Sequence, residues 1–184
     1  MREDTAAARA RLIEILQARS VRRERVVLAS GKESDFYVDA RQTTLHAEGA
    51  ALVARLILAR LRDDVVAVGG PVTGADPIAG AVAALSWIEG RPVQGFMVRK
   101  EPKGHGLRQW IEGRGGLPDG SPVAVVEDTT TTGGSLLKAI ERIEEEGLRV
   151  VQCITVVDRQ EGAAERLVER GYTLEALVAR EDLI

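Results

Sequence analysis

The segment VAVVEDTTTTGGSLLKAI, which begins at residue 123, places acidic, hydroxyl and glycine residues between an apolar run and a helical pattern. Glu127 and Asp128 end the apolar run, so two carboxylates would meet at the end of a buried strand and repel each other. The hydroxyls of a diol, which donate to carboxylates, or a hydrated Mg²⁺ would relieve that repulsion. Seven small polar residues come next: Thr129, Thr130, Thr131, Thr132, Gly133, Gly134 and Ser135.

Hydroxyls and backbone N–H groups at the start of a helix favour an anion, because the helix dipole is positive there. Residues 127–135 therefore suit a sugar diol and a phosphate on one molecule, as in a ribose 5-phosphate. The alternative is an acidic strand end followed by a Thr-rich helix cap. The motifs GxxxxGK[ST] and GxGxxG are absent, which argues against a P-loop enzyme and a standard dinucleotide fingerprint.

A second segment, RKEPKGHG (99–106), is strongly cationic. Lys100 and Lys103 are half of the lysines in the chain, and His105 is one of its two histidines. The glycines on either side of His105 predict a hinged loop. Such a loop could close over a polyanion, neutralise a leaving group and exclude water, whereas the alternative is a solvated surface loop.

The chain shows no arrangement for nucleophilic catalysis and no cysteine-rich metal site. Its single cysteine, Cys153, lies in the apolar run VVQCITVV, which favours a buried core thiol over a reactive one. No Ser-His-Asp or Cys-His set is visible, and metal sites usually need several His or Cys ligands.

Composition sets broad limits on the class of protein. With 184 residues, 45% hydrophobic and 29% charged, the chain fits one globular domain over residues 1–184. Aromatic residues at 3% argue against base stacking, and a net charge of −3 argues against a broad surface for nucleic acid. We see no signal peptide and no apolar run of about 18 residues, so we expect a cytoplasmic protein without a membrane span.

The periodicity predicts the elements that must position these side chains. A helix over 4–19 precedes two short strands around the turn Ser30-Gly31-Lys32, within residues 26–42. Strands and helices then alternate, with a long loop over 101–120. The strands are expected at 65–70, 92–100, 121–128, 150–159 and 172–179, and the helices at 48–62, 78–88, 133–147 and 163–171.

Apolar strands alternating with helices are typical of an α/β fold with a mainly parallel central sheet and helices on both faces. Ligands of such sheets bind beyond the carboxyl ends of the strands. Residues 68–71, 99–101 and 127–129 end three of the predicted strands, so we expect them to share one site.

Residues 127–135 resemble the phosphoribosyl-diphosphate (PRPP) binding motif of the type I phosphoribosyltransferases. The resemblance implies that Glu127 and Asp128 hold the ribose 2- and 3-hydroxyls and that the run 129–135 holds the 5-phosphate. RKEPKGHG, in turn, resembles the catalytic loop of the orotate phosphoribosyltransferases. This second resemblance implies that four side chains contact the diphosphate, namely Arg99, Lys100, Lys103 and His105. Among them, Lys103 is the strongest catalytic candidate.

Three further segments resemble parts of the same family. Residues 20–45 resemble a hood over the base, in which Phe36 and Tyr37 would contact orotate, although Ala29 stands where many members carry a lysine. Lys32 is the candidate to replace that lysine from across the turn. Arg159 resembles the contact to the orotate carboxylate, for which a planar guanidinium is suited, and the alternative is a surface ion pair with Asp158 or Glu161.

Residues 69–80 resemble the diphosphate loop, but Gly74 stands where some members carry a lysine. Asp76 in this segment is predicted to cap the next helix, with a role near the metal as the alternative. Thr131 is a further candidate for orotate binding, beside Phe36, Tyr37 and Arg159. His46 and the three arginines Arg22, Arg23 and Arg25 are expected to be structural or surface residues.

The resemblance covers roughly residues 5 to 180 and implies transfer of the phosphoribosyl group from PRPP to orotate. It also implies Mg²⁺ carried on PRPP, near Asp128, with no protein ligand assigned. A homodimer is implied in which the basic loop reaches the neighbouring active site. The alternatives are a phosphoribosyltransferase for another base, disfavoured by RKEPKGHG, and a non-catalytic nucleotide-sensing regulator of the same fold.

Overall fold

The computed structural model describes residues 2–184 except 23–25, 28–32, 35 and 103–108. A six-stranded sheet forms its centre, in the order β10-β9-β8-β5-β6-β7. All neighbouring strands in it are parallel except β6 and β7. The strands are β5 (Ala67–Pro71), β6 (Gln94–Val98), β7 (Ile111–Glu112), β8 (Pro122–Thr130), β9 (Arg149–Asp158) and β10 (Leu174–Ala179).

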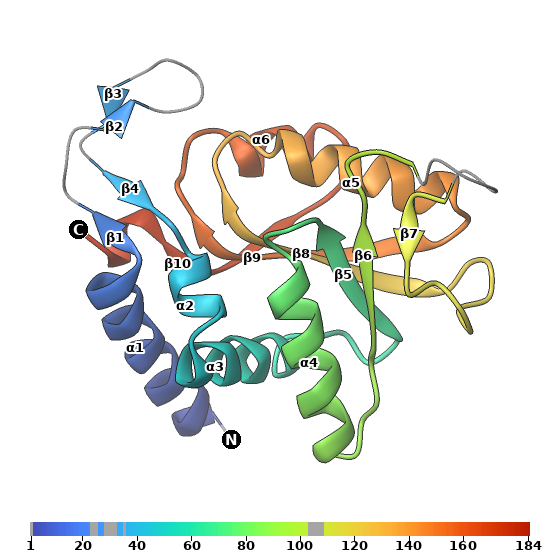
Figure 1. Cartoon of the computed structure of the whole chain (residues 1–184), viewed down its shortest axis with the longest axis horizontal. Helices are drawn as coiled ribbons and strands as arrows, with labels where there is room; N and C mark the ends of the chain where they lie inside the picture. The colour runs from blue at the N-terminus through green and yellow to red at the C-terminus, as the bar shows by residue number, and fades with distance from the viewer. Residues whose placement is uncertain (1, 23–25, 28–32, 35, 103–108) are drawn as a thin grey trace.

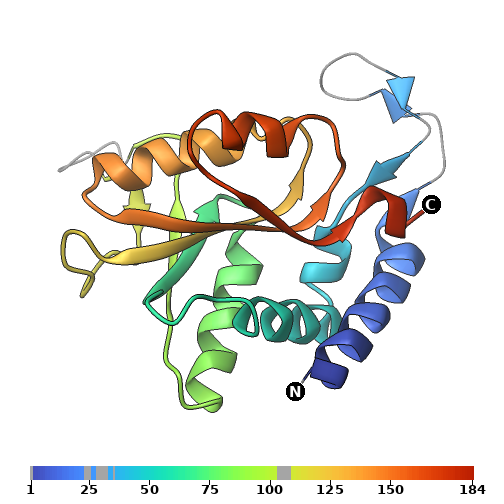
Figure 2. The ribbon, with the colours of Figure 1, turned by 180° about the vertical axis from the view of Figure 1, so that it is seen from behind.

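Helices cover both faces of this sheet, as the sequence predicted (Figure 1). The view from behind shows the same two layers, with α5 and α6 on one side and α1 to α4 on the other (Figure 2). The helices are α1 (Arg2–Arg19), α2 (Arg41–Thr44), α3 (Ala47–Leu58), α4 (Asp76–Ile88), α5 (Gly134–Glu145) and α6 (Ala163–Val168), with a 3₁₀ turn at Arg180–Asp182.

Strand β8 shows why residues 122–126 of the chain are all apolar. Its alternating side chains enter two separate hydrophobic cores, because successive residues of a strand point to opposite faces. Ala124 and Val126 pack in the core under α1, α3 and α4. Val123 and Val125 pack in the core under α5 and α6. Cys153 of β9 is buried in the second core, where burial raises the pKa of its thiol, as expected for an inert core cysteine.

Short elements near the N-terminus agree with the prediction in part. Strand β1 (Val21–Arg22) pairs with β4 (Tyr37–Val38), and β2 (Val26–Val27) pairs with β3 (Glu33–Ser34). The antiparallel pair of β2 and β3 matches the two short strands predicted around residues 30–32, whereas residues 41–44 form the single turn α2, which the sequence did not predict. Pairing of β1 with β4 joins segments too far apart for local periodicity to reveal.

Other local predictions have mixed outcomes. The predicted loop over 101–120 contains β7, and no helix in the described residues could cross a membrane. His46 is structural, because its side chain caps α3 by accepting from the Gly49 N–H at 3.4 Å. Arg22 lies in β1 with an exposed side chain, whereas Arg23 and Arg25 lie outside the described residues.

Candidate active site

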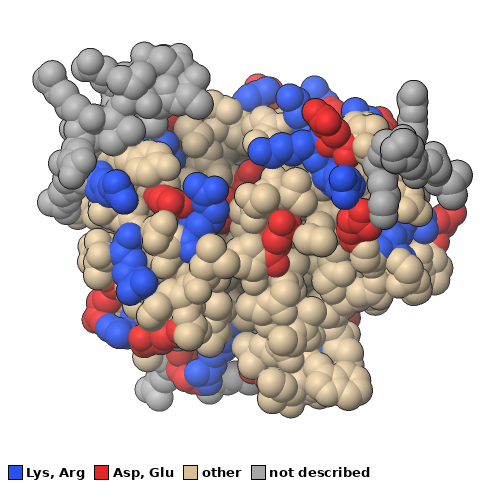
Figure 3. Space-filling view, viewed as in Figure 1, with Lys and Arg blue, Asp and Glu red and all other residues tan. Residues whose placement is uncertain are grey.

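One cavity of about 780 Å³ lies at the carboxyl ends of β5, β6 and β8. It brings together the three predicted strand ends, since residues 71–74, 98–100 and 127–129 all line it. The hood strand β4 and one face of α5 complete its wall. On the face shown in Figure 3, basic side chains lie on both sides of a few acidic ones and form no single broad basic surface.

The acid pair on β8 lies inside this cavity in a largely dehydrated setting. Glu127 is 8% exposed, and burial together with the charge of Asp128 raises the pKa of its carboxyl to about 8. Burial also raises the pKa of Asp128, opposed by the Thr129 N–H, which donates to its Oδ1 at 2.9 Å, and by the charge of Arg41. Glu127 therefore holds a proton near neutral pH in the ligand-free protein.

The Thr/Gly run leads directly into α5. Thr129 and Ser135 line the cavity, and the Thr129 hydroxyl is buried with no partner among the described residues. Gly133 is the N-cap residue of α5 and has a left-handed backbone conformation with φ of 72°. Glycine adopts this conformation without strain. Within the described residues, the backbone N–H groups of 131–135 donate to no protein acceptor. These free donors are the feature that an anion needs.

Not every threonine of the run faces the ligand space. Thr130 is buried, and its hydroxyl donates to Asp158 Oδ1 at 3.2 Å. The Thr132 carbonyl accepts from Arg166 at 3.1 Å, which fixes the outer side of the loop. Thr131, Thr132, Gly133 and Gly134 are not among the residues lining the cavity. Of the run 129–135, Thr129 and Ser135 are the residues that line the cavity.

The loop between β5 and α4 approaches the acid pair closely. A Cβ atom at Gly74 would lie 2.3 Å from Asp128 Oδ1, so a side chain at this position would displace that carboxylate. A lysine in the place of Gly74 therefore does not fit this arrangement. The predicted cap by Asp76 is wrong, because Ala75 occupies the cap position and Asp76 makes no capping hydrogen bond. Its buried Oδ1 has no partner among the described residues, and burial raises its pKa.

The two ends of the basic loop are held together by contacts among residues 99, 110 and 112. The Arg99 N–H donates to the Trp110 carbonyl at 2.8 Å, and the Arg99 guanidinium forms an ion pair with Glu112 at 3.0 Å. Arg142 lies over the Trp110 ring, 4.0 Å from its centroid, and Glu146 accepts from the Trp110 N–H at 3.2 Å. These contacts tie the returning limb of the loop to α5.

Of the four predicted loop cations, the structure places two. Arg99 and the exposed Lys100 line the cavity at the base of the loop. Lys103 and His105 lie outside the described residues, so their predicted roles stay predictions.

The two aromatic residues of the hood, Phe36 and Tyr37, lie in different environments. Tyr37 lines the cavity, whereas Phe36 is 3% exposed and packs in the core, where Arg180 lies over its ring at 5.2 Å from the centroid. Arg159 reaches the hood, since its Nη2 donates to the Phe36 carbonyl at 3.5 Å. The Arg159 side chain is 6% exposed and paired with Glu161 at 2.7 Å. Its buried Nε has no partner among the described residues, although Arg159 is not among the residues that line the cavity. Ala29 and Lys32 of the hood lie outside the described residues.

Several residues that line the cavity belong to none of the sequence motifs. Lys138 and Arg142 line the cavity from α5, and Arg41 lines it from the hood side. The spacing of α5 contained a signal, because Lys138 follows Ser135 by three residues and Arg142 follows Lys138 by four, which puts all three on one helix face. Arg41 gave no such signal, because its place depends on how the hood folds over β8.

Known proteins match nearly the whole chain. Residues 41–173 match the family model described as phosphoribosyl transferase domain. The orotate phosphoribosyltransferase of Bradyrhizobium sp. (strain ORS 278) is 49% identical over 182 residues, which cover 97% of this chain and 98% of the relative.

Solved structures agree with this match. A crystal structure of Mycobacterium tuberculosis H37Rv orotate phosphoribosyltransferase in complex with Fe(III) dicitrate is 42% identical, with a TM-score of 0.83. A structure of the Mycobacterium tuberculosis H37Rv enzyme in complex with PRPP is 40% identical, with a TM-score of 0.78. Each match covers 96% of this chain and 98% of the solved chain.

Proposed function

This chain belongs to the orotate phosphoribosyltransferase family, and we propose that the cavity described above carries out the reaction of that family. The enzyme transfers the 5-phosphoribosyl group from PRPP to orotate, giving orotidine 5′-monophosphate and diphosphate in pyrimidine biosynthesis. The observation that supports this site most directly is the convergence of the acid pair, the start of α5 and the base of the cationic loop on one cavity.

The ribose and the 5-phosphate would bind along β8 and the start of α5. Glu127 and Asp128 accept hydrogen bonds from the 2- and 3-hydroxyls. These hydroxyls supply hydrogen bonds that water does not supply to the two buried carboxyls. The 5-phosphate takes the free N–H groups of 131–135, together with the hydroxyls of Thr129 and Ser135. This holds the sugar with its C1 atom toward the diphosphate loop.

The reaction breaks the bond between C1 and the diphosphate oxygen and forms a bond between C1 and the orotate ring nitrogen. Positive charge develops on the ribose while negative charge grows on the leaving diphosphate. Cationic side chains stabilise that negative charge in a site that excludes water. We assign this role to Arg99, Lys100, Lys103 and His105, with Lys103 as the principal catalytic group.

Mg²⁺ would accompany PRPP. The described residues contain no group of three His, Cys, Asp or Glu side chains placed to hold a metal ion, so the substrate's own oxygens would supply most ligands. Asp128 fits a supporting place, because its carboxylate lies in the cavity and oxygen ligands suit Mg²⁺. When bound, Mg²⁺ offsets part of the charge on the diphosphate.

Orotate would bind under the hood. Tyr37 offers an aromatic face in the cavity, and Arg159 offers a guanidinium for the orotate carboxylate. Thr131 and Phe36 remain candidates, with Phe36 acting from the core through its backbone carbonyl, which accepts from Arg159.

The active form is proposed to be a homodimer in the cytoplasm, in which each basic loop reaches the neighbouring cavity. Mixing two inactive variants tests this arrangement. Lys103→Ala removes the loop function and Asp128→Asn removes the cavity function. A mixed dimer regains one complete site only if the loop acts across the interface, so reassortment should restore about one quarter of wild-type activity. A mixture that stays inactive after reassortment would show that the loop serves its own cavity.

The reaction itself is tested by mixing the protein with PRPP, Mg²⁺ and orotate and following the loss of orotate's ultraviolet absorbance. We expect consumption of orotate with release of diphosphate. Consumption of a purine base without consumption of orotate would replace this function by that of a different phosphoribosyltransferase. Binding of PRPP with no turnover of either base would indicate the non-catalytic regulator.

A further inference from the structure

Arg41 is a cation on the cavity wall that the sequence motifs did not include. It begins α2, and its side chain is about half exposed, at 49%. Its Nε donates to Asp39 Oδ1 at 3.0 Å, and within the described residues its two Nη groups make no hydrogen bond. The guanidinium therefore keeps donors for a ligand while one edge is fixed.

Asp39 is itself well anchored. Its Oδ2 accepts from the Gln42 side chain at 3.2 Å, and its backbone N–H donates to the Ser20 carbonyl at 3.0 Å. Burial alone would raise the pKa of Asp39, but the hydrogen bonds from Arg41 and Gln42 outweigh it and hold the pKa below its ordinary value. Asp39 thus stays ionised and holds Arg41 in place.

Arg41 also acts on the acid pair. Its charge counteracts the effect of burial on Asp128, whereas the charge of Asp39 adds to that effect. An entering polyanion would meet the carboxylates of Asp39 and Asp128 on this side of the cavity. The guanidinium of Arg41 is the group that offsets their repulsion here, because it lines the same wall.

The choice of ligand group follows from the proposed function, on which this inference rests. The substrates carry three anionic groups: the 5-phosphate, the diphosphate and the orotate carboxylate. The proposed function assigns the first to the start of α5 and the last to Arg159. Arg41 interacts with Asp128, whose carboxylate lies against Gly74 of the loop between β5 and α4, at the diphosphate end.

We propose that the Arg41 guanidinium binds the diphosphate group of PRPP and that Asp39 positions it to do so. Gly74 contributes no charge at this end of the cavity, and a side chain there would displace Asp128. Arg41 supplies a cation at that end from the hood side of the cavity. A planar guanidinium with free Nη groups suits two phosphoryl oxygens at once.

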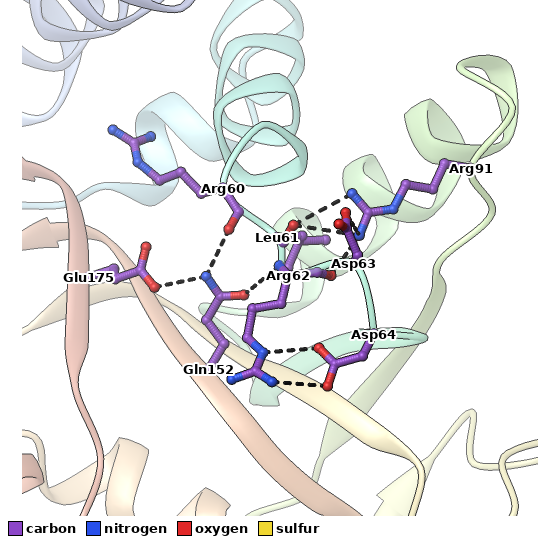
Figure 4. Close-up of polar contacts among 8 residues, drawn as sticks. All are labelled: Arg60, Leu61, Arg62, Asp63, Asp64, Arg91, Gln152 and Glu175. Atoms are coloured by element: carbon purple, nitrogen blue, oxygen red, sulfur yellow. Dashed lines mark hydrogen bonds and ion pairs between the residues drawn. The ribbon is translucent and has the colours of Figure 1, made fainter.

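The test compares Arg41→Gln and Arg41→Lys with a matched control, Arg62→Gln. Arg62 is also held by an aspartate two residues away, since its Nε and Nη2 donate to Asp64 at 2.9 and 3.0 Å. Its side chain is 55% exposed, and it lies before β5, at the amino ends of the strands beside Gln152 (Figure 4). Calorimetry measures the Kd of inorganic diphosphate with Mg²⁺, of PRPP and of ribose 5-phosphate.

We expect Arg41→Gln to weaken diphosphate and PRPP binding by about 10- to 100-fold, because a charge-assisted hydrogen bond is lost. The Kd of ribose 5-phosphate and the KM of orotate should not change. Arg41→Lys should lie between wild type and Arg41→Gln, and Arg62→Gln should match wild type.

Unchanged diphosphate affinity in Arg41→Gln would overturn the inference. An equal loss for ribose 5-phosphate would also overturn it, because that result places Arg41 elsewhere or makes its role structural. Wild-type protein that consumes no orotate would instead contradict the proposed function, so the two failures are distinguishable.

Discussion

Glu127 allows the strongest quantitative prediction. The folded, ligand-free chain holds the proton of this carboxyl up to about pH 8, whereas an ordinary glutamate releases it near 4.5. Between these values the unfolded chain binds fewer protons than the folded chain, so the free energy of unfolding falls as pH rises. One pKa unit is about 1.4 kcal/mol, so this group costs about 3 kcal/mol of stability between about pH 5 and pH 8.

The substitution Glu127→Gln removes the titration while keeping the shape of the side chain. The free energy of unfolding of Glu127→Gln should depend less on pH than that of wild type, by about 3 kcal/mol over the same range. At about pH 8 the variant should therefore be the more stable protein, although it binds PRPP more weakly. Urea denaturation without PRPP, orotate or divalent cations, repeated across this pH range, measures the difference.

Glu141→Gln is the matched control for this measurement. Glu141 also lines the cavity, but it is 55% exposed and forms only a surface ion pair with Arg170 at 3.4 Å. Its substitution should leave the pH dependence of wild type intact. Parallel loss of stability with pH in wild type and Glu127→Gln would refute the reasoning, because it would show that Glu127 is not the group that resists ionisation.

Three further substitutions test other parts of the site. Lys103→Ala should abolish most turnover while the circular dichroism spectrum and thermal midpoint stay unchanged, and near-normal turnover would remove Lys103 from the mechanism. Gly74→Ala should raise the KM of PRPP and cost about 1–3 kcal/mol in urea denaturation, because its Cβ displaces Asp128; unaltered affinity and stability would show that the loop adapts freely. Arg159→Lys should raise the KM of orotate by about 10-fold or more with little change for PRPP, because a lysine cannot bind a carboxylate through a planar fork. An equal rise for both substrates would assign Arg159 a structural role.

The sequence determined the part of the site that is local along the chain. Apolar runs predicted the buried strands, and the polar residues that end them had to meet at one edge, because parallel strands present their carboxyl ends together. The acid pair Glu127 and Asp128, the residues 71–74 and the cation Arg99 therefore share a cavity, as expected.

Tertiary structure decided which side chains within these segments face the ligand. Tyr37 lines the cavity while Phe36 enters the core, although the two are adjacent and both aromatic. The Thr130 hydroxyl turns to Asp158 on β9, and Arg159 meets the hood 123 residues away in the chain. Contacts between distant segments set these outcomes, and no local pattern encodes them.

The charges of the site were known from the sequence, whereas their pKa values and partners depend on the fold. The sequence placed two carboxylates side by side, but the fold buries them, and burial together with the charge of Asp128 raises the pKa of Glu127 to about 8. No sequence motif singled out Arg41, which the fold of the hood brings to the cavity wall near Asp128. Residue type and spacing thus determined which chemistry this chain could carry. The fold decided the protonation states and the partners, because both depend on dehydration and on distances across the sheet.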